Sequence, residues 1–150
     1  MSSYSLNETV KILAKAEYLN PSCSIKDRIA VNMITNAEKT GQLRPGMTVV
    51  AATSGNTGSA VAMACALRGY EYIVITNEKC SKEKVDSMRA YGGKVIIAPA
   101  GVAPTDPKHY MNMEKSMVEA NPEKYYGVDQ YNNPFNAQAY ELTLGPEIWK

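Results

Sequence analysis

Four side chains with a hydroxyl or amide group crowd into one short stretch, Thr53-Ser54-Gly55-Asn56-Thr57-Gly58. This stretch separates an apolar, strand-like run at 48–52 from a helix-like run of small residues at 57–68. Glycines let a backbone approach a ligand closely, and the first amides of a helix attract an anion. An ordinary strand-to-helix turn needs only one capping residue. The stretch therefore predicts an anion-binding site, and its spacing is neither that of a Walker loop nor GxGxxG.

A lysine, Lys26, stands where a helix is predicted to begin, within Ser24-Ile25-Lys26-Asp27-Arg28. The helix dipole and burial both disfavour the ammonium form at this position, and a neutral amine is suited to attack a carbonyl group. Taken by itself, however, a lysine followed by Asp27 and Arg28 is more typical of a solvated, polar helix start. Both interpretations stay open at this point.

A third polar segment is Val128-Asp129-Gln130-Tyr131-Asn132-Asn133-Pro134, in which a strand-like end runs into an amide-rich turn. Its composition requires only a turn. Gln130 becomes a candidate site residue only if it lies beside the turn at 53–58.

The elements that must position these segments alternate along the chain. Continuous apolar or alternating runs predict strands, and apolar residues at helical spacing predict helices. The predicted strands are 10–18, 48–52, 70–76, 94–98 and 125–128; the predicted helices are 26–40, 57–68, 81–92 (with Ser81 as its cap), 108–120 and one from about 135. This alternation predicts an α/β fold, an open and mostly parallel sheet with helices on both faces in three layers. We expect 48–52 and 72–76 at its centre, with Thr53–Gly58 at the carboxyl edge and Gln130 close by.

Composition narrows the class of protein. A chain of 150 residues with 45% hydrophobic residues can bury one core. Its 16 basic and 15 acidic residues are balanced, which argues against a nucleic-acid or membrane partner. The three cysteines show no paired spacing and His109 has no neighbouring ligand, so we expect free thiols and no metal site. The chain has no membrane-length or leader-like apolar stretch, and these features together predict a soluble, cytoplasmic protein.

Taken in order, the three polar segments resemble the pyridoxal-phosphate-dependent β-replacement enzymes, the family of cysteine synthases and cystathionine β-synthases. That family carries N-P-x-x-S-V/I-K-D-R, T-S-G-N-T-G and D-Q-Y/F-x-N-P, and all three motifs occur here in that order. The run from 68 to 99 and the Pro-Thr-Asp-Pro at 104–107 are most similar to the cystathionine β-synthase branch. The resemblance covers about 10–150. It implies an N-terminal extension at 1–9, followed by the small, N-terminal part of a fold-type II catalytic domain.

The resemblance also implies a role for each motif. Lys26 would hold pyridoxal 5'-phosphate and then take the α-proton of an amino-acid substrate. Asn56 would hydrogen-bond the ring oxygen of the cofactor. The substrate α-carboxylate would be bound by the loop and the amide, through Thr53, Ser54, Gly55, Asn56, Thr57 and Gln130. A thiol or sulfide would replace the β-substituent of serine or an activated serine, giving cystathionine or cysteine.

The chain also departs from the family pattern. Ala51-Ala52 replaces a usual Glu-Pro, Ser22-Cys23 replaces small glycine-rich residues, and 1–9 lacks a Gly-Asn-Thr-Pro-Leu segment. The glycine- and threonine-rich phosphate cradle and the hydroxyl partner of the pyridine nitrogen are missing as well. In the family, both come from a second half of the catalytic core. The fold is thus expected to be incomplete relative to the two-domain core, and the final helical run looks cut.

We therefore expect a truncated chain that is inactive alone and binds the cofactor weakly. The alternative is a non-catalytic relative, a pseudoenzyme or regulatory module that binds amino acids. A nucleotide-binding α/β domain is a weaker third reading, because the phosphate-loop spacings are absent. Removal of half a core bares apolar surface, so we expect a homo-oligomer or association with a full-length relative.

Overall fold

The apolar run at 48–52 forms the strand β1 (Thr48–Ala52), and each of its residues is buried. The computed structural model describes residues 12–149. In it, β1 pairs in parallel with β2 (Glu71–Asn77) on one side and with β4 (Tyr125–Gly127) on the other, and β3 (Lys94–Ala98) pairs in parallel with β2. The strand order is β3-β2-β1-β4. The prediction of a parallel sheet centred on 48–52 and 72–76 is confirmed.

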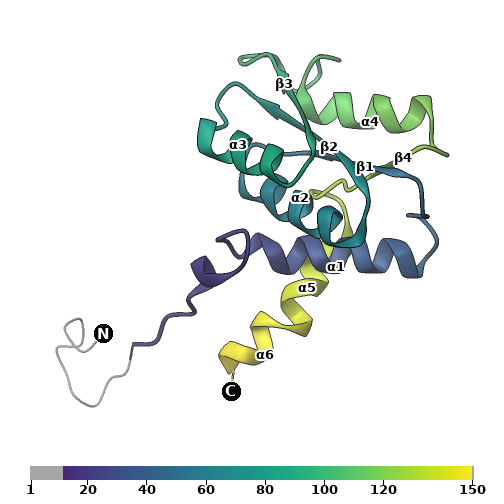
Figure 1. Ribbon diagram of the computed structural model, residues 1–150. Helices are drawn as coiled ribbons and strands as arrows, with labels where there is room; N and C mark the ends of the chain where they lie inside the picture. Colours follow the sequence, from purple (N-terminus) through teal and green to yellow (C-terminus); the bar gives the residue numbers. More distant parts are fainter. Residues whose placement is uncertain (1–11, 150) are drawn as a thin grey trace.

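Helices cover both faces of this sheet (Figure 1). One face carries α4 (Tyr110–Ala120), and the other carries α2 (Asn56–Arg68) and α3 (Lys82–Ala90), with α1 (Lys26–Lys39) packed against α2. The chain ends in α5 (Pro134–Leu142), which packs along α1, and α6 (Leu144–Trp149). The predicted three-layer arrangement is therefore confirmed.

Alternation along the strands divides the core in two, because successive side chains of a strand point to opposite faces. Val49 and Ala51 pack with Met33 of α1 in the larger cluster. Val50 and Ile75 pack toward Met117 of α4 in the smaller one. In the described residues no helix is long and apolar enough to cross a membrane.

The order of the strands creates a switch point between β1 and β4. The chain passes from β1 to β2 to β3 in one direction and then crosses back through α4 to place β4 on the far side of β1. Where the order reverses in this way, the loops after the two strands run apart and leave a crevice at their carboxyl ends, which is where open α/β folds bind ligands. The loop after β1 is the turn at 53–58, and the segment after β4 contains Gln130.

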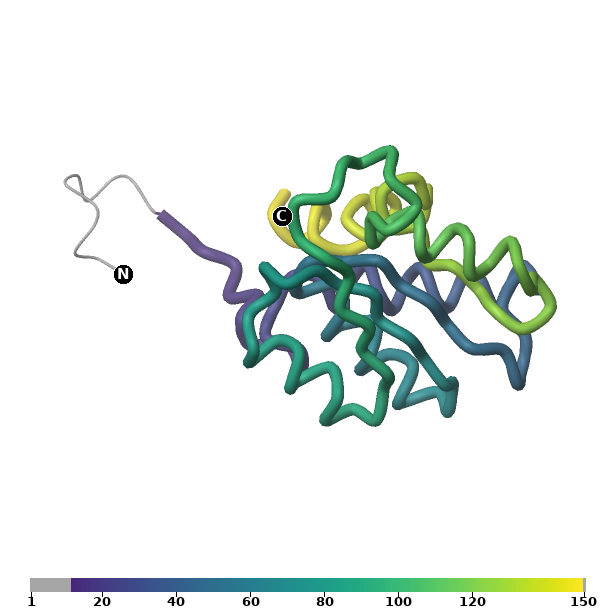
Figure 2. The backbone as a smooth tube through the Cα atoms, turned by 90° about the horizontal axis from the view of Figure 1, so that it is seen from above, coloured from purple at the N-terminus to yellow at the C-terminus, as the bar shows by residue number. Residues whose placement is uncertain are grey.

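The predicted strand at 10–18 is wrong within the described residues. Residues 12–16 carry no regular structure, and Glu17–Leu19 forms a short 3-10 helix, η2. Residues 10 and 11, like the expected extension at 1–9, lie outside the described part. Figure 2 shows the segment from residue 12 leading away from the sheet. A strand needs a neighbour to satisfy its backbone groups, and no strand among residues 12–149 pairs with this segment.

Two details at helix ends also differ from expectation. The helical run from about 135 is broken at Thr143, whose backbone is not helical. Pro146 explains the break, since it has no N–H to donate and its ring crowds the carbonyl four residues earlier. Ser81 stands at the N-cap position of α3, but its side chain makes no capping hydrogen bond.

An ion-pair cluster ties the two ends of the described chain together. Arg28 of α1 binds Glu17 of η2 and Glu147 of α6, both at 2.8 Å, and Lys15 also contacts Glu147. The Arg28 hydrogen bond, followed by that of Lys15, lowers the pKa of Glu147 from 4.5 to about 2.

Acid should therefore release α6 from α1. A lowered carboxyl pKa contributes stability above its ordinary value of 4.5, and that stability is lost as the pH falls toward about 2. We expect the Glu147 carboxyl carbon, followed by NMR, to titrate with a midpoint well below 4.5, and the midpoint to rise toward 4.5 in Arg28→Ala. Because the Glu147 side chain is exposed to solvent, high salt should reduce the difference. Equal midpoints in the two proteins would contradict the ion pair.

Candidate functional site

The turn after β1 is held in shape by its own backbone. The Thr53 N–H donates to the Ile75 carbonyl at 2.9 Å, the Gly55 N–H to Thr53 Oγ1 at 3.2 Å, and the Gly58 N–H to the Gly55 carbonyl at 2.9 Å. Within residues 12–149, the N–H groups of Asn56 and Thr57 at the start of α2 have no acceptor. The loop thus presents free amides at the positive end of a helix dipole, which favours an anion.

The side chains of the loop divide into two groups. Ser54 and Asn56 are exposed and free to meet a ligand, whereas Thr53 and Thr57 are buried at the base of the loop. Thr53 Oγ1 already accepts the Gly55 N–H, so one of its two acceptor positions is used within the turn. Thr53 therefore mainly stabilises the shape of the turn.

Gln130 lies directly against this loop, as expected. Its Nε2 donates to the carbonyl of Ala52, the residue before Thr53, at 2.9 Å. The backbone carbonyl of Gln130 accepts from Asn136 Nδ2 at 2.8 Å, and this bond fixes the segment to the start of α5. Two polar segments that are 77 residues apart therefore meet at the switch point.

Lys26 is at the same edge of the sheet as the loop. The C-terminal end of α1 leads into β1 at the amino edge, so the helix begins near the carboxyl ends of the strands (Figure 1). The Ser24 hydroxyl accepts the N–H of Lys26, the first residue of α1, at 3.2 Å. Lys26 Nζ is half-buried and lies 3.5 Å from the Tyr140 hydroxyl of α5. No carboxylate pairs with Lys26 among residues 12–149, so its amine is available.

The residues after Lys26 do not form the solvated helix start that their composition alone favours. Asp27 is buried, and it accepts the Ser22 N–H at 2.8 Å and the Ser22 hydroxyl. Arg28 is largely buried in its ion pairs with Glu17 and Glu147. Both side chains fix the turn that presents Lys26, which favours the chemical interpretation of this segment.

The sequence analysis did not identify two charged residues that lie near the loop. Glu114 of α4 is buried below the loop, where burial raises the pKa of its carboxyl despite N–H donors from Asp129 and Ala52. The sequence pattern could have indicated a buried carboxylate, because Glu114 lies within the apolar face that Tyr110, Met113 and Met117 form at helical spacing. Lys84 of α3 lies over the loop, with Nζ 3.2 Å from where a Cβ on Gly55 would be.

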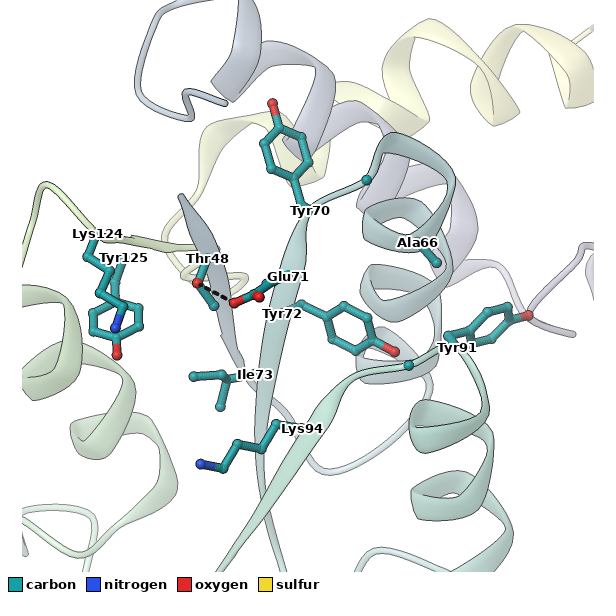
Figure 3. Close-up of a pocket in the computed structure, with 12 residues that line it drawn as sticks. Thr48, Ala66, Tyr70, Glu71, Tyr72, Ile73, Tyr91, Lys94, Lys124 and Tyr125 are labelled. Carbon is teal, nitrogen blue, oxygen red and sulfur yellow. Dashed lines mark hydrogen bonds between the residues drawn. The ribbon is translucent and has the colours of Figure 1, made fainter. Parts of the chain in front are cut away.

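A groove lies at the opposite edge of the sheet from the loop. It has a volume of about 580 Å³ and lies at the amino ends of the strands (Figure 3). Figure 3 shows Tyr72 and Tyr91 on one side of β2, with Thr48, Tyr125 and Lys124 on the other. It is an open groove far from the helix N-termini and the switch point, so we place the candidate site at the carboxyl edge.

Comparison with known proteins decides the family. The family model for pyridoxal-phosphate dependent enzymes matches residues 2–150. The chain belongs to this family. Cystathionine beta-synthase of Apis mellifera is 42% identical over 140 residues, and cysteine synthase A of Escherichia coli K12 is 41% identical over the same length. The solved structure of a hydrogen sulfide-producing enzyme from Fusobacterium nucleatum matches with a TM-score of 0.78 at 36% identity, covering 89% of this chain.

These relatives are much longer than the chain. Alignment covers 93% of this chain but only 28% of the Apis protein and 42% of the Escherichia protein, and 42% of the Fusobacterium structure. For this pyridoxal-phosphate family member, the residues present fit part of a cofactor site. Lys26 offers an amine without a carboxylate partner, and the loop offers free amides at a helix N-terminus. A cradle for the phosphate is not among the described residues.

Proposed function

We propose that this chain supplies the lysine-bearing, carboxylate-binding part of a site for pyridoxal-phosphate-dependent β-replacement on serine or an activated serine, giving cystathionine or cysteine. The observation that carries the proposal is the contact between Gln130 and Ala52, which joins the amide of one motif to the loop of another. The family membership and the identity to a cystathionine beta-synthase and a cysteine synthase support the reaction class.

Each part of the site has a role in this proposal. The Asn56 and Thr57 amides and the Ser54 hydroxyl would bind the substrate carboxylate, and the Gln130 side chain would close the crevice beside them. Lys26 would hold the cofactor and move the α-proton at its Nζ, and the Tyr140 hydroxyl lies 3.5 Å from that amine. When bound, the cofactor supplies the electron sink at the substrate α-carbon. Asn56 would orient the cofactor ring.

A second candidate function is amino-acid binding without catalysis. The loop and Gln130 are joined by hydrogen bonds inside this chain alone, so a carboxylate can be bound without the remainder of a catalytic core. A regulatory or pseudoenzyme role would need no more than this.

Two measurements on the isolated protein test the proposal. L-serine added to isotope-labelled protein should shift the amide resonances of 53–58 and the side-chain amide of Gln130. Pyridoxal phosphate at high concentration, followed by borohydride, should add one pyridoxyl group that mass spectrometry locates on Lys26. Serine binding without Lys26 labelling would favour the non-catalytic function. Absence of both serine binding and Lys26 labelling would contradict both candidate functions.

We also propose that the chain associates with itself. Large apolar side chains are exposed near both ends of the described part, including Leu13, Leu19, Leu142 and Ile148, and Trp149 is 92% exposed. Clusters of exposed apolar residues commonly mark an interaction surface. Light scattering at increasing concentration should show a dimer or larger assembly, and Trp149→Ser should shift it toward monomer. A monomer at millimolar concentration would contradict the proposal.

A further inference from the structure

A buried carboxylate joins the two segments that form the candidate site. Glu114 is 8% exposed and sits in the middle of α4. Its Oε2 accepts the N–H of Ala52 at 2.8 Å, and its Oε1 accepts the N–H of Asp129 at 3.0 Å. No lysine or arginine pairs with it among residues 12–149. Its only compensation for burial in this part of the chain is therefore a set of backbone donors.

The two backbone donors lie where the sheet opens. The β1–β4 ladder pairs Thr48 to Val50 with Tyr125 to Gly127, and the last bond across it runs from the Val128 N–H to the Val50 carbonyl at 2.9 Å. Beyond that point the β1–β4 ladder ends. The next N–H groups are those of Ala52, which is buried, and Asp129, whose bond to Glu114 is partly buried, and an unpaired N–H in such a place is costly. Glu114 provides one oxygen to each.

Each of these donors is next to a segment of the candidate site. Ala52 precedes Thr53, and Asp129 precedes Gln130. Ala52 is held from two sides, since its N–H donates to Glu114 and its carbonyl accepts from Gln130. Gly127 also packs closely on this carboxylate, because a Cβ there would lie 3.3 Å from Glu114 Oε1. The spacing between the loop and Gln130 is thus set through one side chain.

We propose that Glu114 is a positioning residue that fixes the 53–57 loop and Gln130 at the separation that an amino-acid carboxylate requires. This inference rests on the proposed function for the identity of the ligand. An ionised carboxylate has two oxygens that both accept hydrogen bonds, and these bonds are stronger than bonds between neutral groups. Glutamine has the same shape, but its NH₂ group would face one of the two N–H donors, so it can satisfy only one.

The test compares Glu114→Gln with a control on the same helix, Met117→Gln. Met117 packs on the Val50 and Ile75 cluster and makes no hydrogen bond to the site segments. In wild type we expect a nuclear Overhauser effect between the Gln130 side-chain amide and the Ala52–Thr53 backbone. Glu114→Gln should weaken or abolish it and raise the dissociation constant for L-serine about tenfold. Met117→Gln should lower thermal stability while leaving both readouts within about twofold of wild type.

The outcomes separate this inference from the proposed function. If Glu114→Gln keeps the Overhauser effect and wild-type serine affinity, Glu114 is only a core residue and the inference is wrong. If Met117→Gln weakens serine binding equally, the effect comes from stability and the inference is wrong again. If wild type does not bind L-serine, the proposed ligand is wrong, and loss of the Overhauser effect in Glu114→Gln alone still supports the positioning role.

Discussion

Replacement of Lys26 by alanine should abolish covalent attachment of pyridoxal phosphate to this protein. Its Nζ is the amine that the turn at 22–25 presents, and it lies beside Tyr140 without a carboxylate partner in the described part of the chain. Amines attack the carbonyl of this cofactor, and borohydride makes the bond permanent. Mass spectrometry after reduction should find the pyridoxyl group on Lys26 in wild type and none at that site in Lys26→Ala.

Attachment should need a high cofactor concentration. Charge-assisted hydrogen bonds to a phosphate contribute roughly 1.5–3 kcal/mol each, and no phosphate cradle is present in residues 12–149. Lys39→Ala, at the other end of the same helix, is the matched control and should label like wild type. Equal labelling of many lysines would contradict a special role for Lys26. Tight, stoichiometric cofactor in the purified protein would show that an assembly of chains completes the site.

Replacement of Gly58 by alanine should be the most destabilising change at the loop. A Cβ at this position would lie 2.5 Å from Met88 Cε and 2.9 Å from Thr53 Cγ2. Met88 and Thr53 are both buried, so neither can move into solvent. Overpacking of this kind costs about 1–3 kcal/mol, which outweighs the roughly 1 kcal/mol that alanine gains over glycine in a helix. Urea denaturation should therefore show a lower midpoint for Gly58→Ala.

Gly55→Ala is the matched control for this change. Its Cβ would meet only the end of the Lys84 side chain, at 3.2 Å, and a lysine can move aside into solvent. We expect a free energy of unfolding within about 0.5 kcal/mol of wild type. A Gly58→Ala protein as stable as wild type would show that α2 and α3 can separate without cost.

Much of the fold follows from local pattern. The continuous apolar run at 48–52 could be recognised as a strand because a parallel strand covered on both faces needs no polar side. The run at 94–98 also forms a strand, but β3 lies at the edge of the sheet and only its Ala98 is buried. The four-residue crowding of polar groups at 53–57 identified the loop, since no cap requires so many. Lys26 could be chosen only through the order of the three motifs. Its local neighbours favoured a solvated helix start, because the burial of Asp27 and Arg28 comes from partners elsewhere in the chain.

The sequence by itself thus determined the α/β class, the central strands and the three polar segments. Tertiary structure alone decided which segments meet. The placement of β4 beside β1, rather than beside β3, brings Gln130 to Ala52, and no local propensity encodes that pairing. From the sequence, Glu114 is one more charge on an amphipathic helix. Only the folded chain shows that the N–H groups of Ala52 and Asp129, at the end of the β1–β4 ladder, both donate to its oxygens. The physical reason is that hydrogen-bond demand at a switch point arises from chain segments far apart in sequence, so it exists only once they are packed together.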